Sequence, residues 1–114
     1  MGPFSAFVKA GGLVFLSGQV GLKDGKLISS DLQSQVEQAV ANIVQVLGWD
    51  GLSLLDIVDI TVFLADMNDY AAFNTVYENV FRHVKDLPTR TCVAVAALPL
   101  GARVELKVIA ARRI

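Results

Sequence analysis

Arg90 and Glu105 are the two residues whose types and positions indicate chemistry. They lie in neighbouring stretches, residues 90–95 and 103–110, with a Leu-Pro-Leu-Gly turn sequence between the stretches. Each stretch alternates between two sets of side chains, which is the period of a β-strand. Where the strands lie near one another, the guanidinium and the carboxylate meet on the sheet face away from the hydrophobic core. This arrangement predicts a site for a small molecule.

Two amphipathic segments predict the helices that support this site. The first is expected to begin at Ser30, with Gln33 three residues later as in a capping box, and to end at Gly48. Its apolar stripe consists of Leu32, Val36, Ala39, Val40, Ile43, Val44 and Leu47. The second is expected to be capped by Asn68 or Asp69. Its stripe consists of Tyr70, Phe73, Val76, Tyr77, Val80, Phe81 and Val84.

The remaining segments predict strands. Residues 6–10 and 12–19 are expected to form a hairpin around Gly11-Gly12, and a short strand is expected after the Asp24-Gly25 turn. The β-branched segment 57–65 predicts a buried strand. The order β-β-(β)-α-β-α-β-β indicates an α+β fold in which a mixed sheet carries both helices on one face. A length of 114 residues predicts a single domain, residues 1–114.

The second face of this sheet is expected to be apolar. Two helices cover one face only, and an apolar second face does not stay in contact with water. We therefore expect a homo-oligomer that buries it. The residues expected on this face are Phe7, Phe15, Asp59, Thr61, Phe63, Cys92, Ala94, Ala96 and Ile109.

Composition limits the class of protein. Hydrophobic residues make up 54% of the chain and charged residues 18%, so a large apolar surface must be buried. No apolar run reaches the roughly 18 residues of a membrane-spanning helix, and the N-terminus lacks the pattern of a secretory signal. A net charge of −1 without a cationic cluster argues against nucleic-acid binding, and one histidine with one cysteine gives no zinc-type spacing. We expect a cytoplasmic protein.

Several fragments together resemble the Rid (reactive intermediate/imine deaminase, YjgF-type) family over essentially the full length. They are Gly2-Pro3-Phe4-Ser5, Ser17-Gly18-Gln19, Thr61–Leu64 followed by Asp66-Met67, Phe73-Asn74 with Tyr77, and Arg90-Thr91-Cys92-Val93 through Glu105. The resemblance implies a chorismate-mutase-like α+β domain that assembles as a homotrimer, with sites in the clefts between subunits. It also implies hydrolysis of 2-imino acids of the 2-iminobutanoate and 2-iminopropanoate type, which arise from released enamines, to 2-keto acids and ammonia. The implied reaction needs no metal or organic cofactor.

The resemblance also assigns roles to individual residues. Arg90 would hold the carboxylate of the imino acid through a two-pronged hydrogen bond, and Glu105 would hold the attacking water and accept its proton. Ser17 would form a polar wall of the site, and Cys92 would contribute its backbone and a further wall. Phe4 is a departure, because deaminase members commonly have a tyrosine there, and phenylalanine lacks the hydroxyl.

Each of these residues also has a structural interpretation. Arg90 fits a solvated strand end, and Glu105 fits a carboxylate paired with a neighbouring cation, either Lys107 or Arg103. Ser17 fits a turn cap. Asn74 lies at the edge of its helix's apolar stripe, where an interfacial hydrogen bond is as consistent with a structural as with a functional role.

Cys92 and His83 are residue types that often act in catalysis, but we do not assign a catalytic role to either. A nucleophilic role for Cys92 is rejected, because no histidine lies at a suitable spacing. His83 follows Arg82 at the end of its helix, where cations suit the helix dipole.

Two alternative functions besides deamination are consistent with the sequence or with the names of the family. The first is a non-catalytic member of the family that uses the same cleft to bind a small carboxylate as a regulator. It also needs Arg90 but does not need a residue that positions water. The second is a ribonuclease or translation inhibitor, from names attached to the family, and the net charge of −1 argues against it.

Overall fold

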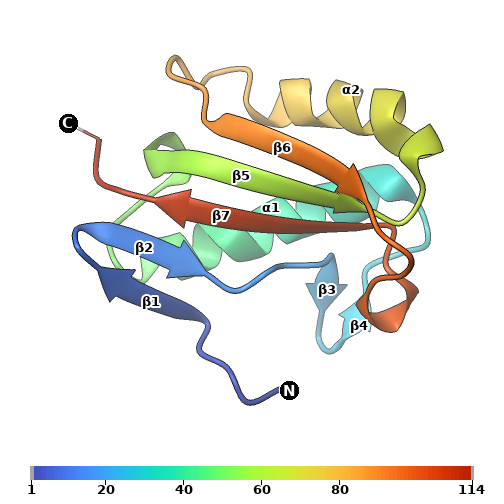
Figure 1. Ribbon diagram of the computed structural model, residues 1–114, viewed down its shortest axis with the longest axis horizontal. Coiled ribbons are helices and arrows are strands. Elements are labelled where there is room, and N and C mark those ends of the chain that lie inside the picture. Colours follow the sequence, from blue (N-terminus) through green and yellow to red (C-terminus); the bar gives the residue numbers. More distant parts are fainter. Residues whose placement is uncertain (1, 114) are drawn as a thin grey trace.

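The computed structural model describes residues 2–113, and Figure 1 shows a curved sheet with both helices on its far side. The strands are β1 (Phe7–Ala10), β2 (Leu13–Leu16), β3 (Leu22–Lys23), β4 (Lys26–Leu27), β5 (Ile57–Leu64), β6 (Thr89–Ala94) and β7 (Val104–Ala110). The helices are α1 (Leu32–Gly48) and α2 (Tyr70–Val80), with single 3₁₀ turns at Leu54–Asp56, Met67–Asp69 and Pro99–Gly101. The mixed α+β fold with two helices on one face is confirmed.

The main sheet has the strand order β1-β2-β7-β5-β6, and β3 and β4 form a separate hairpin. β5 and β6 are parallel, whereas the other neighbours in the main sheet are antiparallel. The hairpin around Gly11-Gly12 is confirmed, and both glycines have positive φ, 57° and 82°. β6 and β7, which carry Arg90 and Glu105, are not neighbours, because β5 lies between them (Figure 1).

The hydrophobic core lies between the sheet and the helices. Leucine, isoleucine and valine side chains on alternate positions of β5 and β7 are buried there, as the period-2 pattern predicts. Helix α1 buries the stripe that includes Ala39, Ile43 and Leu47, and α2 buries Phe73. The sheet residues of this core are Val14, Leu16, Ile57, Ile60, Val62, Leu64, Val104, Leu106, Val108 and Ala110.

The ends of α1 differ from the sequence prediction by a few residues. Asp31, not Ser30, is the N-cap, because its carboxylate accepts a hydrogen bond from the backbone N–H of Ser34 at 2.8 Å. Hydrogen bonds from the Ser29 hydroxyl and from Ser34 lower the pKa of Asp31 to about 2. Gly48 is the last helical residue, and the glycine with positive φ is Gly51, at 73°.

The start of α2 also differs from the prediction. The Asp66 carboxylate accepts a hydrogen bond from the backbone N–H of Asn68 at 2.9 Å and so caps the 3₁₀ turn that leads into the helix. Asp69 is the residue before α2 but makes no side-chain cap. Its carboxylate is instead paired with Arg103.

The open face of the sheet differs in part from the predicted one. Phe15 pairs with Ile109, and Asp59, Thr61 and Phe63 alternate with buried core residues of β5, so these five lie on the open face as predicted.

Three assignments to this face are wrong. Phe7, Cys92 and Ala94 pair with the buried residues Leu16, Val62 and Leu64 and therefore share the helix-covered face, while Ala96 lies beyond the end of β6. Small and apolar residues occupy both faces of β6, so its alternation does not indicate which face is covered.

Asp56 anchors the C-terminal segment. Its side chain is 9% exposed, and its two carboxylate oxygens accept backbone hydrogen bonds from Ser53 at 2.9 Å and Arg113 at 3.0 Å. Its own carbonyl accepts from the N–H of Ala111 at 2.9 Å. Burial opposes ionisation, but these two backbone N–H groups and the Arg112 guanidinium outweigh it and lower the pKa of Asp56.

We expect Asp56→Asn to destabilise the protein by about 1–3 kcal/mol near neutral pH, because an amide group then faces a backbone donor. The folded-state pKa is lowered, so the ionised carboxyl contributes stability above its unfolded pKa, near 4, and loses it as the pH falls through the folded value. Urea unfolding at several pH values should show the difference from wild type shrinking in acid. Asp24→Asn, at an exposed turn position with φ of 53°, is the matched control. A constant difference down to pH 2 would contradict this role.

Candidate functional site

A hollow of about 410 Å³ lies at the open face of the sheet and contains three of the predicted site residues. Glu105 reaches it from β7, Ser17 from the end of β2, and Phe4 from the N-terminal segment. Its other lining residues are Gly18, Pro99 and Lys107. The hollow therefore combines a carboxylate, an ammonium and a hydroxyl with an exposed aromatic ring.

Gly18 allows the Glu105 carboxylate to lie against the backbone. A Cβ atom at position 18 would collide with the carboxylate oxygen of Glu105 and would approach its Cδ to 3.0 Å. Gln19 and Leu106 exchange two backbone hydrogen bonds, each of 2.8 Å, which hold the segment after β2 against β7. The absence of a side chain at Gly18 thus lets the Glu105 carboxylate occupy this position.

The other polar groups of the hollow hold neighbouring backbone. The Ser17 hydroxyl donates to the carbonyl of Ser5 at 2.5 Å and so holds the segment that carries Phe4. The Lys107 ammonium donates to the carbonyl of Leu16 at 2.5 Å. Phe4 itself is 62% exposed. Among residues 2–113, Glu105 forms no ion pair with Lys107 or Arg103.

Arg90 lies on the helix-covered side, against three aromatic rings of α2. Its guanidinium carbon is 4.8 Å from the ring centre of Tyr77 and 5.6 Å from those of Tyr70 and Phe73. One Nη of Arg90 donates to the Tyr70 hydroxyl at 3.2 Å. Cation–π contacts of this kind hold a guanidinium in place while leaving its other N–H groups available.

Cys92 and Asn74 lie on the same side. Burial raises the pKa of the Cys92 thiol, and the charge of Arg90 only partly opposes this, so the thiol is a poor nucleophile. The Asn74 side-chain oxygen is buried and has no hydrogen-bond partner within residues 2–113. A buried acceptor without a partner is unusual and marks a place where a donor is missing.

The prediction that Arg90 and Glu105 share a sheet face is wrong for a single chain. Arg90 pairs with Ile60, which is buried under the helices, whereas Glu105 pairs with Phe63, three positions along β5 and on the opposite face. The structure therefore divides the six predicted residues into two groups. Phe4, Ser17 and Glu105 line the hollow, and Arg90, Cys92 and Asn74 lie on the side of α2.

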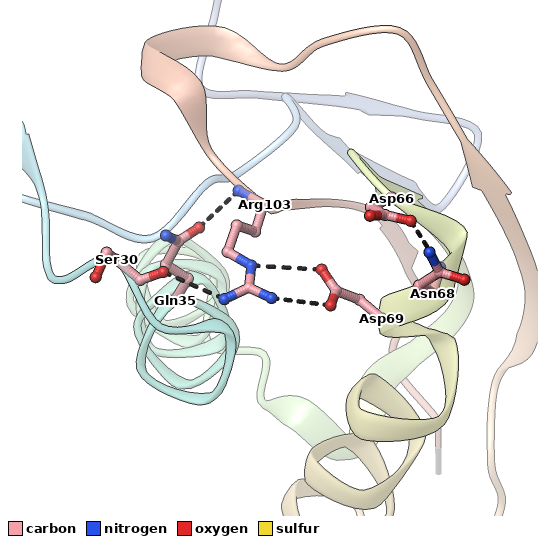
Figure 2. Close-up of polar contacts among 6 residues, drawn as sticks. All are labelled: Ser30, Gln35, Asp66, Asn68, Asp69 and Arg103. Atoms are coloured by element: carbon pink, nitrogen blue, oxygen red, sulfur yellow. Dashed lines mark hydrogen bonds and ion pairs between the residues drawn. The ribbon is translucent and has the colours of Figure 1, made fainter.

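Sequence reasoning missed the polar network that positions the start of α2 (Figure 2). Arg103 forms a two-pronged contact with the Asp69 carboxylate, at 2.9 and 3.4 Å, and its backbone N–H donates to the Gln35 side chain at 2.8 Å. Gln35 is 1% exposed and lies within the apolar stripe of α1. A polar residue inside that stripe was the available signal, because a buried amide requires partners.

Two further observations describe what the structure does not contain. Within residues 2–113, no three histidine, cysteine, aspartate or glutamate side chains are grouped so that they could hold a metal ion. No helix in this part of the chain is both long enough and apolar enough to cross a membrane.

The fold and the two groups of polar residues define a small α+β protein with a sheet-face hollow and an arginine held on the opposite side. The family described as endoribonuclease L-PSP matches residues 1–112. The chain therefore belongs to this family, which is the Rid (YjgF-type) family that its motifs resemble.

Relatives and solved structures agree with this membership. Protein HMF1 of Saccharomyces cerevisiae is 44% identical over 111 residues, which cover 96% of this chain and 84% of HMF1. TdcF of Escherichia coli, which carries the provisional name reactive intermediate deaminase, is 39% identical over 98% of this chain and 88% of its own length. The crystal structure of Escherichia coli TdcF with bound serine aligns with a TM-score of 0.91 and 37% identity, covering 99% of this chain and 91% of that one.

Proposed function

We propose that the protein hydrolyses reactive 2-imino acids of the 2-iminobutanoate and 2-iminopropanoate type to 2-keto acids and ammonia, which removes a damaging metabolite. The observation that carries this proposal is the Arg90 guanidinium, held by three aromatic rings with N–H groups available for a carboxylate. TdcF binds serine, in which a carboxylate adjoins a carbon that bears nitrogen. A 2-imino acid has the same arrangement of carboxylate and nitrogen, which supports the assignment.

Glu105 is the proposed general base. Its carboxylate lies in the hollow and would accept a proton from water as the water oxygen bonds to the imine carbon. Glu105 then returns this proton to the former imine nitrogen, which gives a carbinolamine. The hydroxyl proton of the carbinolamine passes to nitrogen, the C–N bond breaks, and ammonia leaves as the carbonyl forms. This reaction consumes one water and uses no metal or organic cofactor.

We propose that the site is completed between copies of the chain. Arg90 and Glu105 lie on opposite faces of one sheet, so a single chain does not present both to one ligand. The open face, with Phe15, Phe63 and Ile109, is the apolar surface that a second copy would cover. A homotrimer in which Arg90 of one copy faces the hollow of the next satisfies both observations.

The other predicted residues receive supporting roles. Asn74, whose buried side-chain oxygen has no partner within residues 2–113, belongs to the wall of the site on α2, and Ser17 supplies a polar wall in the hollow. Cys92 lines the site beside Arg90 and takes no covalent part. Phe4 provides an apolar wall without the hydroxyl that a tyrosine would bring.

A non-catalytic binding protein is the second candidate, since the crystal structure of TdcF contains bound serine and a binding role alone accounts for it. We expect Glu105→Gln to lower kcat for imine hydrolysis by about a hundredfold and to change carboxylate binding little, because only catalysis needs the base. The assay follows loss of an imine that an amino-acid oxidase generates. Glu78→Gln, on an exposed position of α2, is the control. A kcat equal to that of wild type would remove the assignment of Glu105 as the base, whereas a wild-type protein that binds the carboxylate without speeding imine loss would leave the binding role.

The cellular location of the protein stays a prediction. The name of mmf1 from Schizosaccharomyces pombe, 41% identical over 96% of this chain and 68% of its own length, places that relative in mitochondria, whereas we propose the cytoplasm for this chain.

RNA cleavage, which the family description names, is not proposed. The net charge is −1, and His83, the single histidine of the sequence, accepts a hydrogen bond from Arg82 at 3.1 Å.

A further inference from the structure

We propose that Tyr70 is a carboxylate-binding residue, and that its hydroxyl donates a second hydrogen bond to the ligand carboxylate that Arg90 holds. This inference rests on the proposed role of Arg90 and adds a donor to it. The sequence places Tyr70 in the apolar stripe of its helix, but 42% of the residue is exposed, so its ring is not a core side chain.

The hydrogen bond between Arg90 and Tyr70 sets the direction of the hydroxyl proton. Arg90 has donors only, so at 3.2 Å the Tyr70 oxygen accepts, and its own proton points away from the guanidinium. No acceptor for that proton is present among residues 2–113. Two donors from adjacent groups are thus available side by side. A carboxylate, with two oxygens and about four acceptor positions, can accept from both at once.

The position of Tyr70 is fixed by the residue before it. Asp69 is joined to Arg103 through two contacts, and Figure 2 shows this pair at the start of α2. Arg103 also reaches the carbonyl of Ser30 at 3.5 Å, and its backbone is bound to Gln35 of α1. Buried Gln35 donates in turn to the carbonyl of Ser29 at 2.9 Å.

This network ties the first turn of α2 to α1 and to the start of β7. The Tyr70 hydroxyl therefore stands in place before a ligand arrives, and little ordering entropy opposes binding.

The test measures binding of 2-oxobutanoate, the unreactive keto-acid product, by isothermal titration calorimetry. Tyr70→Phe keeps the ring under Arg90 and removes only the hydroxyl, so we expect Kd to rise about ten- to a hundredfold, the value of one hydrogen bond to a charged group. Thr75→Val is the control. It removes an exposed hydroxyl of α2 that donates to the carbonyl of Ala71 at 3.3 Å.

The outcomes separate this inference from the proposed function. An unchanged Kd in Tyr70→Phe, or the same loss in Thr75→Val, overturns the role of the Tyr70 hydroxyl, while a large loss in Arg90→Ala upholds the role of Arg90. An unchanged Kd in Arg90→Ala overturns both. Thermal unfolding of each variant shows whether the fold is retained. A selective rise in Kd for Tyr70→Phe with an unchanged melting temperature supports the inference.

Discussion

Replacing Arg90 with alanine is expected to lower kcat/KM for imine hydrolysis by about a thousandfold, which corresponds to roughly 4 kcal/mol. The substitution removes the charged, two-pronged partner of the substrate carboxylate. It also leaves the rings of Tyr70, Phe73 and Tyr77 without the cation they surround. Both binding and orientation of the substrate are lost, so KM should rise and kcat should fall.

Arg90→Lys and Arg82→Ala complete this experiment. Lysine keeps the charge but loses the planar fork and its stacking, so an intermediate rate is expected. Arg82 is an exposed arginine after α2 that donates to Asn79 at 2.6 Å, and its removal should leave the rate unchanged. The measurement is the rate of keto-acid formation from imine supplied by an amino-acid oxidase. A rate for Arg90→Ala near that of wild type would falsify the assignment.

The second large effect is restoration of activity when two inactive variants are mixed. Arg90→Ala and Glu105→Gln chains, unfolded together in urea and refolded, should regain about one quarter of wild-type activity if each site takes its arginine from one copy and its glutamate from the next. Such a site is intact only when the arginine comes from a Glu105→Gln chain and the glutamate from an Arg90→Ala chain. Random assembly places each in its required position half of the time.

Three controls define the result of mixing. Wild-type protein taken through the same unfolding and refolding sets the full scale, and the double variant sets the background. Light scattering coupled to size-exclusion chromatography shows whether trimers form. Trimeric mixtures with no activity above the double variant would contradict a site shared between copies, and a monomer at micromolar concentration would contradict the proposed assembly.

The element order could be predicted from the sequence because each element has a clear local signal. The stripe of α1, the β-branched segment of β5 and the two glycines of the first hairpin fixed the types of these elements. The caps were less accurate. Ser29, Ser30 and Asp31 are all suitable caps, and the choice of Asp31 depends on which oxygen reaches the backbone N–H of Ser34.

The site was harder to predict because its arrangement depends on contacts between distant segments. The motifs supplied Arg90 and Glu105, but the registers of β6 and β7 against β5 decide which face each occupies. The alternation of small residues in β6 carries little information about that register. The sequence places Tyr70 in an apolar stripe, and the role proposed for its hydroxyl depends on the neighbouring Arg90.

The contact between Gly18 and Glu105 has a consequence for how related sequences are interpreted. The carboxylate can occupy its present position only because position 18 has no carbon beyond the backbone. A homologue with both charged residues but a larger residue at this position would therefore hold its carboxylate in a different place. Assigning activity across the family by the presence of arginine and glutamate alone would miscount such proteins. The glycine at position 18 is informative because its missing side chain leaves the space that the Glu105 carboxylate occupies.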